Sequence, residues 1–214
     1  MNRELADMRV NYAMKALDIV DVDPNPIVQF QIWFDEAKQA QIKEPNAMIL
    51  ATVDADNAPD TRTVLLKGIE NNGFVFYTNY HSTKGTQLKN NDQCALTFLW
   101  LDLERQIRIK GNCNKVEQAV TDAYFQSRPR DSQIGAWTSP QSKVISSRKE
   151  LEDLFIANVE KFKDIAVIPT PNFWGGYCVI PKEIEFWQGR PNRLHDRLKY
   201  QRVGDSWEIV RLAP

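Results

Sequence analysis

The segment 190–197, which reads RPNRLHDR, concentrates groups that bind or act on small ligands. His195 and three arginines lie within these eight residues, and Trp187 precedes them. If the RLHDR stretch is a strand, its side chains alternate, so Arg193, His195 and Arg197 share one face. Like charges on one face repel each other, and arginine forks suit phosphate or carboxylate. The stretch therefore predicts a site for an anionic or electron-rich ligand, with a solvated, ion-paired face as the alternative.

A second group of donors follows four-residue spacing. Tyr124, Arg128 and Ser132 would form one polar ridge if a single helix ran through them. Pro129 opposes that, because the residue before a proline avoids the helical region. Two hydroxyls around a guanidinium suit a phosphate group. Packing of Tyr124 and solvation of Arg128 is an equally good reading of this stretch alone.

Further candidates are scattered along the chain. Arg62 and Lys67 lie an odd number of residues apart, so a regular strand sends them to opposite faces, toward two anions or toward one anion and solvent. Ser82 would cap a short helix with Lys84 in its first turn, where free N–H groups bind anions, although a solvated lysine is more common. Weaker candidates are Gln106 for the edge of a heterocycle, Gln141 and Ser142 for phosphate, and Trp187 for stacking on a planar ring.

The helices and strands that must position these residues are indicated by the spacing of apolar residues, which is helical in some segments and alternating in others. Helical spacing predicts helices within 23–42, 118–127 and 146–163, with Pro26 in the first turn of the first helix and Ser147 and Glu150 as a capping box on the last. Alternating and apolar runs predict strands at 47–54, 61–69, 74–79, 173–180 and 183–189, two strands within 94–117, and a hairpin over 197–214. Asn72-Gly73 and Gly204-Asp205 are the expected hairpin turns. Seven or eight mostly antiparallel strands with inserted helices predict an α+β fold with a closed or nearly closed barrel.

Composition excludes several classes of function. The chain has 214 residues and a net charge of −1, which disfavours nucleic acid and anionic membranes as partners. Cys94, Cys113 and Cys178 are odd in number and far apart, so we expect neither a disulfide framework nor a zinc site, and a reducing cytosol fits best. His81 and His195 are too distant in sequence to suggest a metal site. We find no apolar signal-peptide core, no membrane-spanning run, no G-x-G-x-x-G and no Walker A motif.

These signals together suggest two anionic groups and a flat heterocycle, held by a barrel that lacks the usual nucleotide loops. Flavin mononucleotide (FMN) with a phosphorylated substrate meets that description. A nucleic-acid site with interleaved basic and aromatic residues also meets it, but the near-neutral charge argues against that alternative.

Seven ordered motifs resemble the pyridoxine/pyridoxamine 5′-phosphate oxidase family. They are RTVLLK, VFYTN, LERQIRI, YFQSRPRDSQIGAW, FWGGY, IEFWQG and RLHDR, followed by a C-terminal RLAP. The resemblance covers about residues 24–214, with a looser match at Arg9 and Tyr12. It implies an FMN-binding split β-barrel with peripheral helices, one oxidase domain over 21–214 after an arm or short helix over 1–20, and a cytoplasmic homodimer with FMN between subunits.

The resemblance also implies an activity and its residues. Pyridoxamine or pyridoxine 5′-phosphate would be oxidised to pyridoxal 5′-phosphate, with O2 reoxidising the flavin to give H2O2. The FMN residues carried over are Arg62, Thr63, Val64, Leu65, Leu66, Lys67, Tyr77, Thr78, Thr83, Lys84, Gln106, Gln141, Ser142, Trp187 and Arg197. The substrate residues carried over are Lys67, Tyr124, Arg128 and Ser132 for the phosphate, Arg193 and His195 at the ring, and Arg9 and Tyr12 closing over it. No metal is implied, and Arg190 is expected on the surface.

One position departs from the family, and one rival function remains. Thr83 stands where the family often has arginine, which removes a charge from the flavin phosphate site. The mechanism we expect is hydride transfer from the substrate's exocyclic carbon to the flavin, with Arg193 and His195 as catalytic residues. Arg193 would position the substrate, and His195 would hydrogen-bond its amine or alcohol and accept a proton. The rival is a non-catalytic protein that binds flavin or pyridoxal phosphate, which would not need a second phosphate site.

Overall fold

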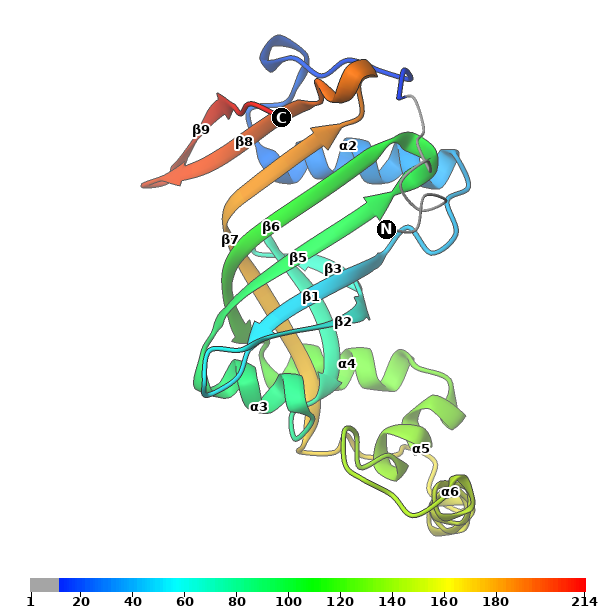
Figure 1. Ribbon diagram of the computed structural model, residues 1–214. Coiled ribbons are helices and arrows are strands. Elements are labelled where there is room, and N and C mark those ends of the chain that lie inside the picture. Colours follow the sequence, from blue (N-terminus) through cyan, green and yellow to red (C-terminus); the bar gives the residue numbers. More distant parts are fainter. Residues whose placement is uncertain (1–11) are drawn as a thin grey trace, which may run out of the picture. The chain divides into compact units, whose positions relative to one another are not determined.

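The computed structural model describes residues 12–214 (Figure 1), so Arg9 lies outside the described residues. The described part contains five α-helices and nine strands. It divides into two compact units. Unit 1 comprises the described part of Met1–Leu50 with Ala95–Gly111 and Pro181–Pro214, and unit 2 comprises Ala51–Cys94 and Asn112–Ile180. The expectation of one oxidase domain over 21–214 stays a prediction.

The strands join in one hydrogen-bonded order, β2-β1-β5-β6-β7-β4-β3, and β8 pairs with both β7 and β9. Four strands have residues in both units: β1 (Ala47–Val53), β5 (Gln93–Trp100), β6 (Arg105–Lys115) and β7 (Trp174–Gln188). The 173–180 and 183–189 runs were expected as two strands, but they form the single strand β7. Its first half pairs antiparallel with β4 and its second half pairs antiparallel with β8.

Unit 2 holds the candidate phosphate residues. Its further elements are β2 (Pro59–Leu65), β3 (Gly68–Glu70), β4 (Gly73–Asn79), α3 (Thr83–Asn90), α4 (Gln118–Ser127), α5 (Arg130–Thr138) and α6 (Arg148–Phe162). The β3–β4 turn lies at Asn71 and Asn72, both with positive φ, one residue earlier than predicted. Gly73 instead starts β4, where a Cβ would lie 2.3 Å from the sulfur of Cys178.

The expected ridge over Tyr124, Arg128 and Ser132 is not one helix. Helix α4 ends at Ser127, Arg128 is extended with φ −76° and ψ 148°, and α5 begins after Pro129. Proline forbids the helical conformation at the preceding residue, and this break turns the chain there.

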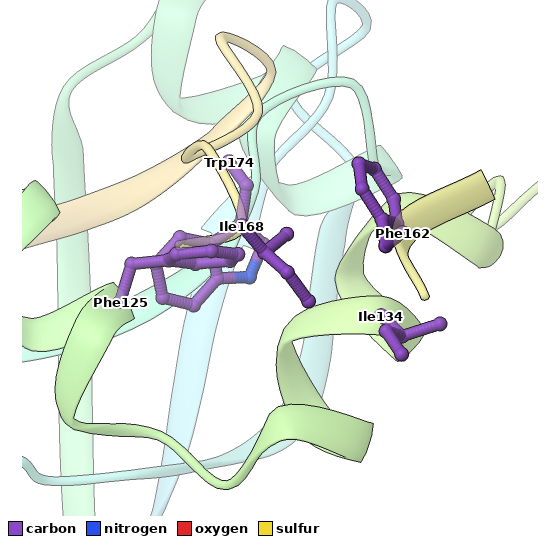
Figure 2. Packing of buried hydrophobic residues seen from close by; sticks show 5 residues of the cluster. All are labelled: Phe125, Ile134, Phe162, Ile168 and Trp174. Atoms are coloured by element: carbon purple, nitrogen blue, oxygen red, sulfur yellow. The ribbon is translucent and has the colours of Figure 1, made fainter. Parts of the chain in front are cut away.

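A buried apolar cluster fixes α4, α5, α6 and the start of β7 in unit 2. It consists of Phe125, Ile134, Phe162, Ile168 and Trp174 (Figure 2). Helix α6 begins as predicted, because the Ser147 hydroxyl accepts from the Glu150 N–H. The Glu150 carboxylate bonds to Ser146 instead of closing the box on Ser147. Phe162, the last residue of α6, is buried.

Unit 1 holds the RLHDR segment. Its further elements are η1 (Ile19–Asp21), α2 (Pro26–Gln39), η2 (Leu101–Leu103), η3 (Pro191–Arg193), β8 (Asp196–Val203) and β9 (Ser206–Arg211). Pro26 opens α2 as predicted, and β8 and β9 form the predicted hairpin with Gly204 at φ 60°. The prediction that RLHDR is a strand is wrong for its first three residues, because the strand begins only at Asp196. Asn192 and Arg193 both have positive φ, 57° and 61°, so the alternation of faces along a strand does not apply to Arg193 and His195.

Candidate functional site

A cavity of about 450 Å³ in unit 2 gathers most of the predicted phosphate residues. Its walls come from the end of β2 and the residues after it, from β4, from α3, from the segment around the α4–α5 break, from the loop before α6 and from the first residue of β7. None of the lining residues carries a carboxylate, and three of them are cations. The lining residues are Thr63, Val64, Leu65, Lys67, Tyr77, Thr78, Lys84, Tyr124, Arg128, Pro129, Ser132, Gln141 and Trp174.

Arg128 brings an unsatisfied donor to this cavity. Its Nη1 is buried and has no hydrogen-bond partner among the described residues. The guanidinium lies 4.6 Å from the centre of the Trp174 ring. Burial lowers the pKa of Arg128 below its usual value, because the charged form loses its hydration. A buried donor without a partner destabilises the protein, and a ligand that accepted a hydrogen bond from Nη1 would remove this cost.

Lys84 lies in the first turn of α3, as predicted. The Ser82 hydroxyl caps this helix by accepting from the Gly85 N–H, at 3.3 Å. Lys84 is only 8% exposed, and in the part of the chain described it forms no ion pair. Burial is the largest cause that lowers the pKa of Lys84. The positive charge of Arg62 lowers it further, and Asp60 opposes the shift. An anion at the start of α3 would relieve both effects.

The other candidates for the flavin phosphate are distributed differently. Arg62 does not line the 450 Å³ cavity; its guanidinium forms an ion pair with Asp60 and hydrogen bonds with Thr52 and Gln87. Thr83 and Ser142 line a separate hollow of about 320 Å³, and Leu66 is buried. The structure therefore brings Lys84 and Gln141 together with the substrate candidates Lys67, Tyr124, Arg128 and Ser132, and leaves Arg62, Thr83 and Ser142 outside that cavity.

Three aromatic rings form one side of the cavity. Tyr77 and Tyr124 stack with centroids 3.8 Å apart, and Trp174 lies nearly parallel to both. Burial raises the pKa of Tyr77 to about 12, so its phenol stays neutral at physiological pH. Sequence reasoning missed Trp174. The sequence signal that points to Trp174 is the FWGGY motif. A Cβ on Gly175 would lie 2.1 Å from the Tyr80 hydroxyl, which explains why a glycine follows this tryptophan.

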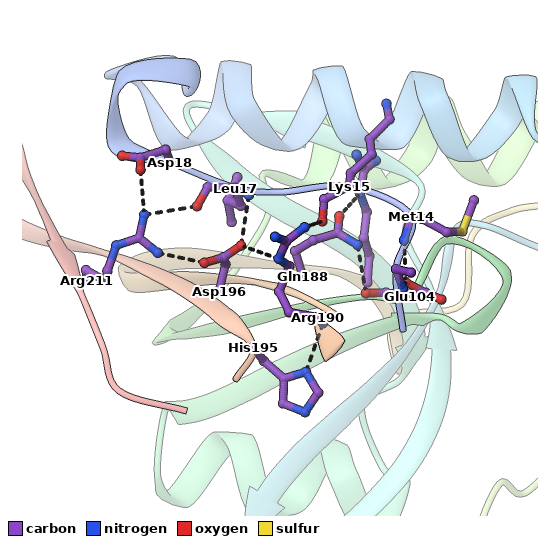
Figure 3. A network of polar contacts seen from close by, with 12 residues as sticks. Met14, Lys15, Leu17, Asp18, Glu104, Gln188, Arg190, His195, Asp196 and Arg211 are labelled. Carbon is purple, nitrogen blue, oxygen red and sulfur yellow. Dashed lines mark hydrogen bonds and ion pairs between the residues drawn. The ribbon is translucent and has the colours of Figure 1, made fainter. Parts of the chain in front are cut away.

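The second group of candidates lies in unit 1, around His195 (Figure 3). The backbone N–H of Arg190 donates to His195 Nδ1 at 3.1 Å. Because Nδ1 is the acceptor, the neutral ring carries its proton on Nε2. The Trp187 ring lies 4.6 Å from the imidazole, and the Tyr12 ring contacts both of them at 5.8–5.9 Å. The predicted residues Tyr12, Trp187 and His195 are therefore neighbours.

Arg193 and Arg197 differ in their surroundings. Arg193 is exposed and has a positive φ of 61°, an uncommon conformation that clusters at functional sites. Arg197 donates to Glu185 at 2.7 Å and to the Ala213 carbonyl at 2.9 Å. Its hydrogen bond to Glu185 raises the pKa of Arg197. Gln106 is half-buried on β6.

Sequence reasoning assigned Arg190 to the surface without a role, and the structure corrects this. Its guanidinium contacts Asp196 at 3.4 Å and donates to the Lys15 carbonyl at 3.1 Å. Asp196 also accepts from the Leu17 N–H and pairs with Arg211 at 2.8 Å. Figure 3 shows that this network fastens the segment after Tyr12 to the loop that carries His195. Two of these contacts, Arg190 to Lys15 and Asp196 to Leu17, join residues 175 and 179 positions apart, which no local pattern reveals.

The described residues contain no cluster of three or more His, Cys, Asp or Glu side chains that could hold a metal ion. Within residues 12–214, no helix is both long enough and apolar enough to cross a membrane.

Comparison with known proteins covers the whole chain. Residues 34–157 match the family profile described as "Pyridoxamine 5'-phosphate oxidase", and residues 174–214 match a "Pyridoxine 5'-phosphate oxidase C-terminal dimerisation region". The pyridoxine/pyridoxamine 5′-phosphate oxidase of Gloeothece citriformis is 52% identical over 100% of both chains. That of Salinibacter ruber is 52% identical over 99% of both.

Solved structures agree with these matches. PhzG from Burkholderia lata, solved in complex with tetrahydrophenazine-1-carboxylic acid, superimposes with a TM-score of 0.88 at 27% identity, over 96% of this chain and 100% of that one. A pyridoxamine 5′-phosphate oxidase-related, FMN-binding protein from Nostoc punctiforme, at 16% identity, shares the fold with a TM-score of 0.70 over 91% of this chain and 99% of that one. The predicted α+β split-barrel fold is thus confirmed. The chain belongs to the pyridoxine/pyridoxamine 5′-phosphate oxidase family.

Proposed function

We propose that this protein oxidises pyridoxamine 5′-phosphate and pyridoxine 5′-phosphate to pyridoxal 5′-phosphate, with FMN as cofactor and O2 as electron acceptor. H2O2 is released in both reactions, and ammonia is released from the amine. Full-length relatives about half identical to this chain bear that name. The observation in the structure that carries the proposal is the carboxylate-free cavity with Lys67, Lys84 and the unsatisfied Arg128, which suits phosphorylated ligands.

The donors of the unit 2 cavity fit FMN. Lys84 is buried without an ion pair among the described residues, at a helix start that favours a phosphate. Residues 63–65 with Tyr77 and Thr78 supply a wall for a planar ring, and Gln141 accepts a hydrogen bond there from the Thr78 hydroxyl at 3.1 Å. FMN, when bound, supplies the two-electron redox chemistry and its reoxidation by O2. The other FMN residues implied by the resemblance, including Arg62, Thr83, Ser142, Gln106, Trp187 and Arg197, belong to the same proposal.

The substrate's phosphate is held by Lys67, Tyr124, Arg128 and Ser132. A phosphate anchored by several donors fixes the substrate far from its reacting carbon, and such orientation lowers the entropic part of the barrier. The buried Nη1 of Arg128 gains the acceptor that it lacks within the described protein.

The substrate's ring lies against Arg193 and His195. Neutral His195 presents an Nε2–H donor, because its Nδ1 accepts from the backbone of Arg190. It hydrogen-bonds the substrate's amine or alcohol group, and Arg193 supports the ring electrostatically. Tyr12, already packed on His195, closes the site together with Arg9.

The enzyme acts in the cytoplasm as a homodimer. The match of residues 174–214 to a dimerisation region supports the dimer. Light scattering of the purified protein should give twice the 24.7 kDa chain mass. A monomer that binds FMN and turns over normally would contradict this part of the proposal.

The activity is tested on the purified protein. We expect a yellow preparation that consumes O2 and forms pyridoxal 5′-phosphate when given pyridoxamine 5′-phosphate, and that acts poorly on pyridoxamine. R128M should raise KM for the phosphorylated substrate, whereas the matched control R148M, which changes an arginine side chain that is 81% exposed, should not. A yellow protein without turnover would instead support a flavin-binding protein without catalytic activity.

A further inference from the structure

We infer that Trp174 is a positioning residue for substrate binding: its indole ring holds the Arg128 guanidinium so that Nη1 faces the substrate's phosphate. The inference rests on the proposed function, because it takes Arg128 as a phosphate ligand. Neither the sequence motifs nor the family resemblance gave Trp174 a role.

The first argument is that the backbone of Arg128 is fixed from both sides. Its N–H donates to the Phe125 carbonyl at the end of α4, at 3.2 Å. Its carbonyl accepts from Gln133 Nε2 of α5, at 2.9 Å. Only the side chain can then move, and a free arginine side chain loses rotamer entropy when it is ordered.

The second argument is that the Arg128 guanidinium lies against the aromatic ring of Trp174. It lies 4.6 Å from the Trp174 ring centre and 5.7 Å from that of Phe125. No carboxylate lines the cavity. The face of the Trp174 ring is therefore the main attractive contact there for the Arg128 guanidinium, whose hydration is reduced by burial. Tryptophan is the strongest of the aromatic partners for a cation.

The third argument is that Trp174 itself cannot move freely. It is 8% exposed and belongs to the buried cluster of Figure 2, with the Phe125 ring against it at 5.3 Å. Its backbone pairs with Asn79 of β4. The ring stack continues to Tyr124, which also lines the cavity. The indole thus links the apolar core of unit 2 to the phosphate donors.

The expected effect is a change in phosphate affinity. W174L removes the ring and should weaken binding of pyridoxal 5′-phosphate about 5- to 30-fold, in line with a desolvated cation–π contact. W174F keeps a ring and should lose about threefold. KM for pyridoxamine 5′-phosphate should rise in parallel, with kcat changed less than about twofold. Binding of pyridoxal, which has no phosphate, should not change. W137L is the matched control, because Trp137 also contacts a cation, Lys161 at 4.9 Å, outside this cavity.

A double-mutant cycle with R128M distinguishes positioning from general structural damage. Dissociation constants of the FMN-loaded protein for pyridoxal 5′-phosphate are measured by equilibrium dialysis, alongside thermal midpoints. We expect W174L to have no further effect once R128M is present. An equal loss in both backgrounds, or an equal loss for pyridoxal, would overturn the inference. If W174L does not fold, the cycle is run with W174F. Oxidase activity of the wild-type protein is measured separately, so that failure of this inference and failure of the proposed function give different results.

Discussion

Two substitutions at His195 should separate its hold on the loop from its contact with the substrate. The side-chain oxygen of asparagine lies near the place of Nδ1 in histidine, so H195N retains an acceptor for the Arg190 N–H, which is 3.1 Å from Nδ1. The same substitution removes the Nε2–H donor. H195Q does the reverse, because the amide of glutamine reaches the place of Nε2.

The magnitudes follow from the contacts of the ring. Each variant loses two ring contacts, with Trp187 at 4.6 Å and Tyr12 at 5.8 Å, and each such contact is worth about 0.5–1.5 kcal/mol. H195Q additionally leaves the Arg190 N–H without its acceptor, at a further cost of about 1 kcal/mol. We therefore expect H195Q to be the less stable variant by about 1 kcal/mol and H195N to be the slower enzyme.

The assay is steady-state formation of pyridoxal 5′-phosphate, with thermal unfolding of the FMN-loaded protein beside it. Loss of one hydrogen bond to substrate should lower kcat/KM of H195N about 10- to 100-fold. A loss of about 10²- to 10⁴-fold would instead indicate proton transfer by His195. Wild-type turnover by H195N would refute the assignment of Nε2 to the substrate, and equal stability of the two variants would refute the role of Nδ1.

Two further predictions concern charged groups. Burial and the positive charge of Arg62 lower the pKa of Lys84 from 10.5, and Asp60 opposes the shift. Wild-type affinity for FMN should therefore fall as pH rises toward 10.5, whereas stability of the apoprotein should rise over the same interval because its folded state releases the proton first. In a fluorescence titration K84M should bind FMN more weakly and lose this pH dependence, and an unchanged pH profile would contradict the prediction. Arg105 is 4% exposed, pairs with Glu36 and donates to Gln188, so R105M should lower the free energy of unfolding in urea by about 2 kcal/mol. A midpoint equal to wild type would show that these contacts do not stabilise the fold.

Most helices and strands were predicted from the sequence because the residues that start a helix or turn a hairpin lie next to it in the chain. Ser82 before α3 and Ser147 before α6 cap their helices by accepting from an N–H three residues later, and Pro26 is the first residue of α2. The GD turn between β8 and β9 likewise needs only one residue with positive φ, Gly204.

The errors arose where distant residues decide the conformation. The RLHDR segment alternates like a strand, but Arg190, Asp196 and the segment near Leu17 hold its first half as a tight turn. For the candidate phosphate residues, the residue types were informative, and the break that Pro129 suggested is present between α4 and α5. Arg128 and Ser132 reach the same cavity because Pro129 interrupts the helix between them.

The residues of the unit 2 cavity are far apart in the sequence, which couples stability of the folded protein to binding of its ligands. Its cations come from three separate parts of the chain, at Lys67, Lys84 and Arg128, so the unfolded chain cannot reproduce the site. A ligand that binds only the folded state stabilises it by about 2.7 kcal/mol at 100 times its dissociation constant. Cellular levels of this protein should therefore follow the supply of flavin, because chains without FMN unfold more often and are degraded sooner.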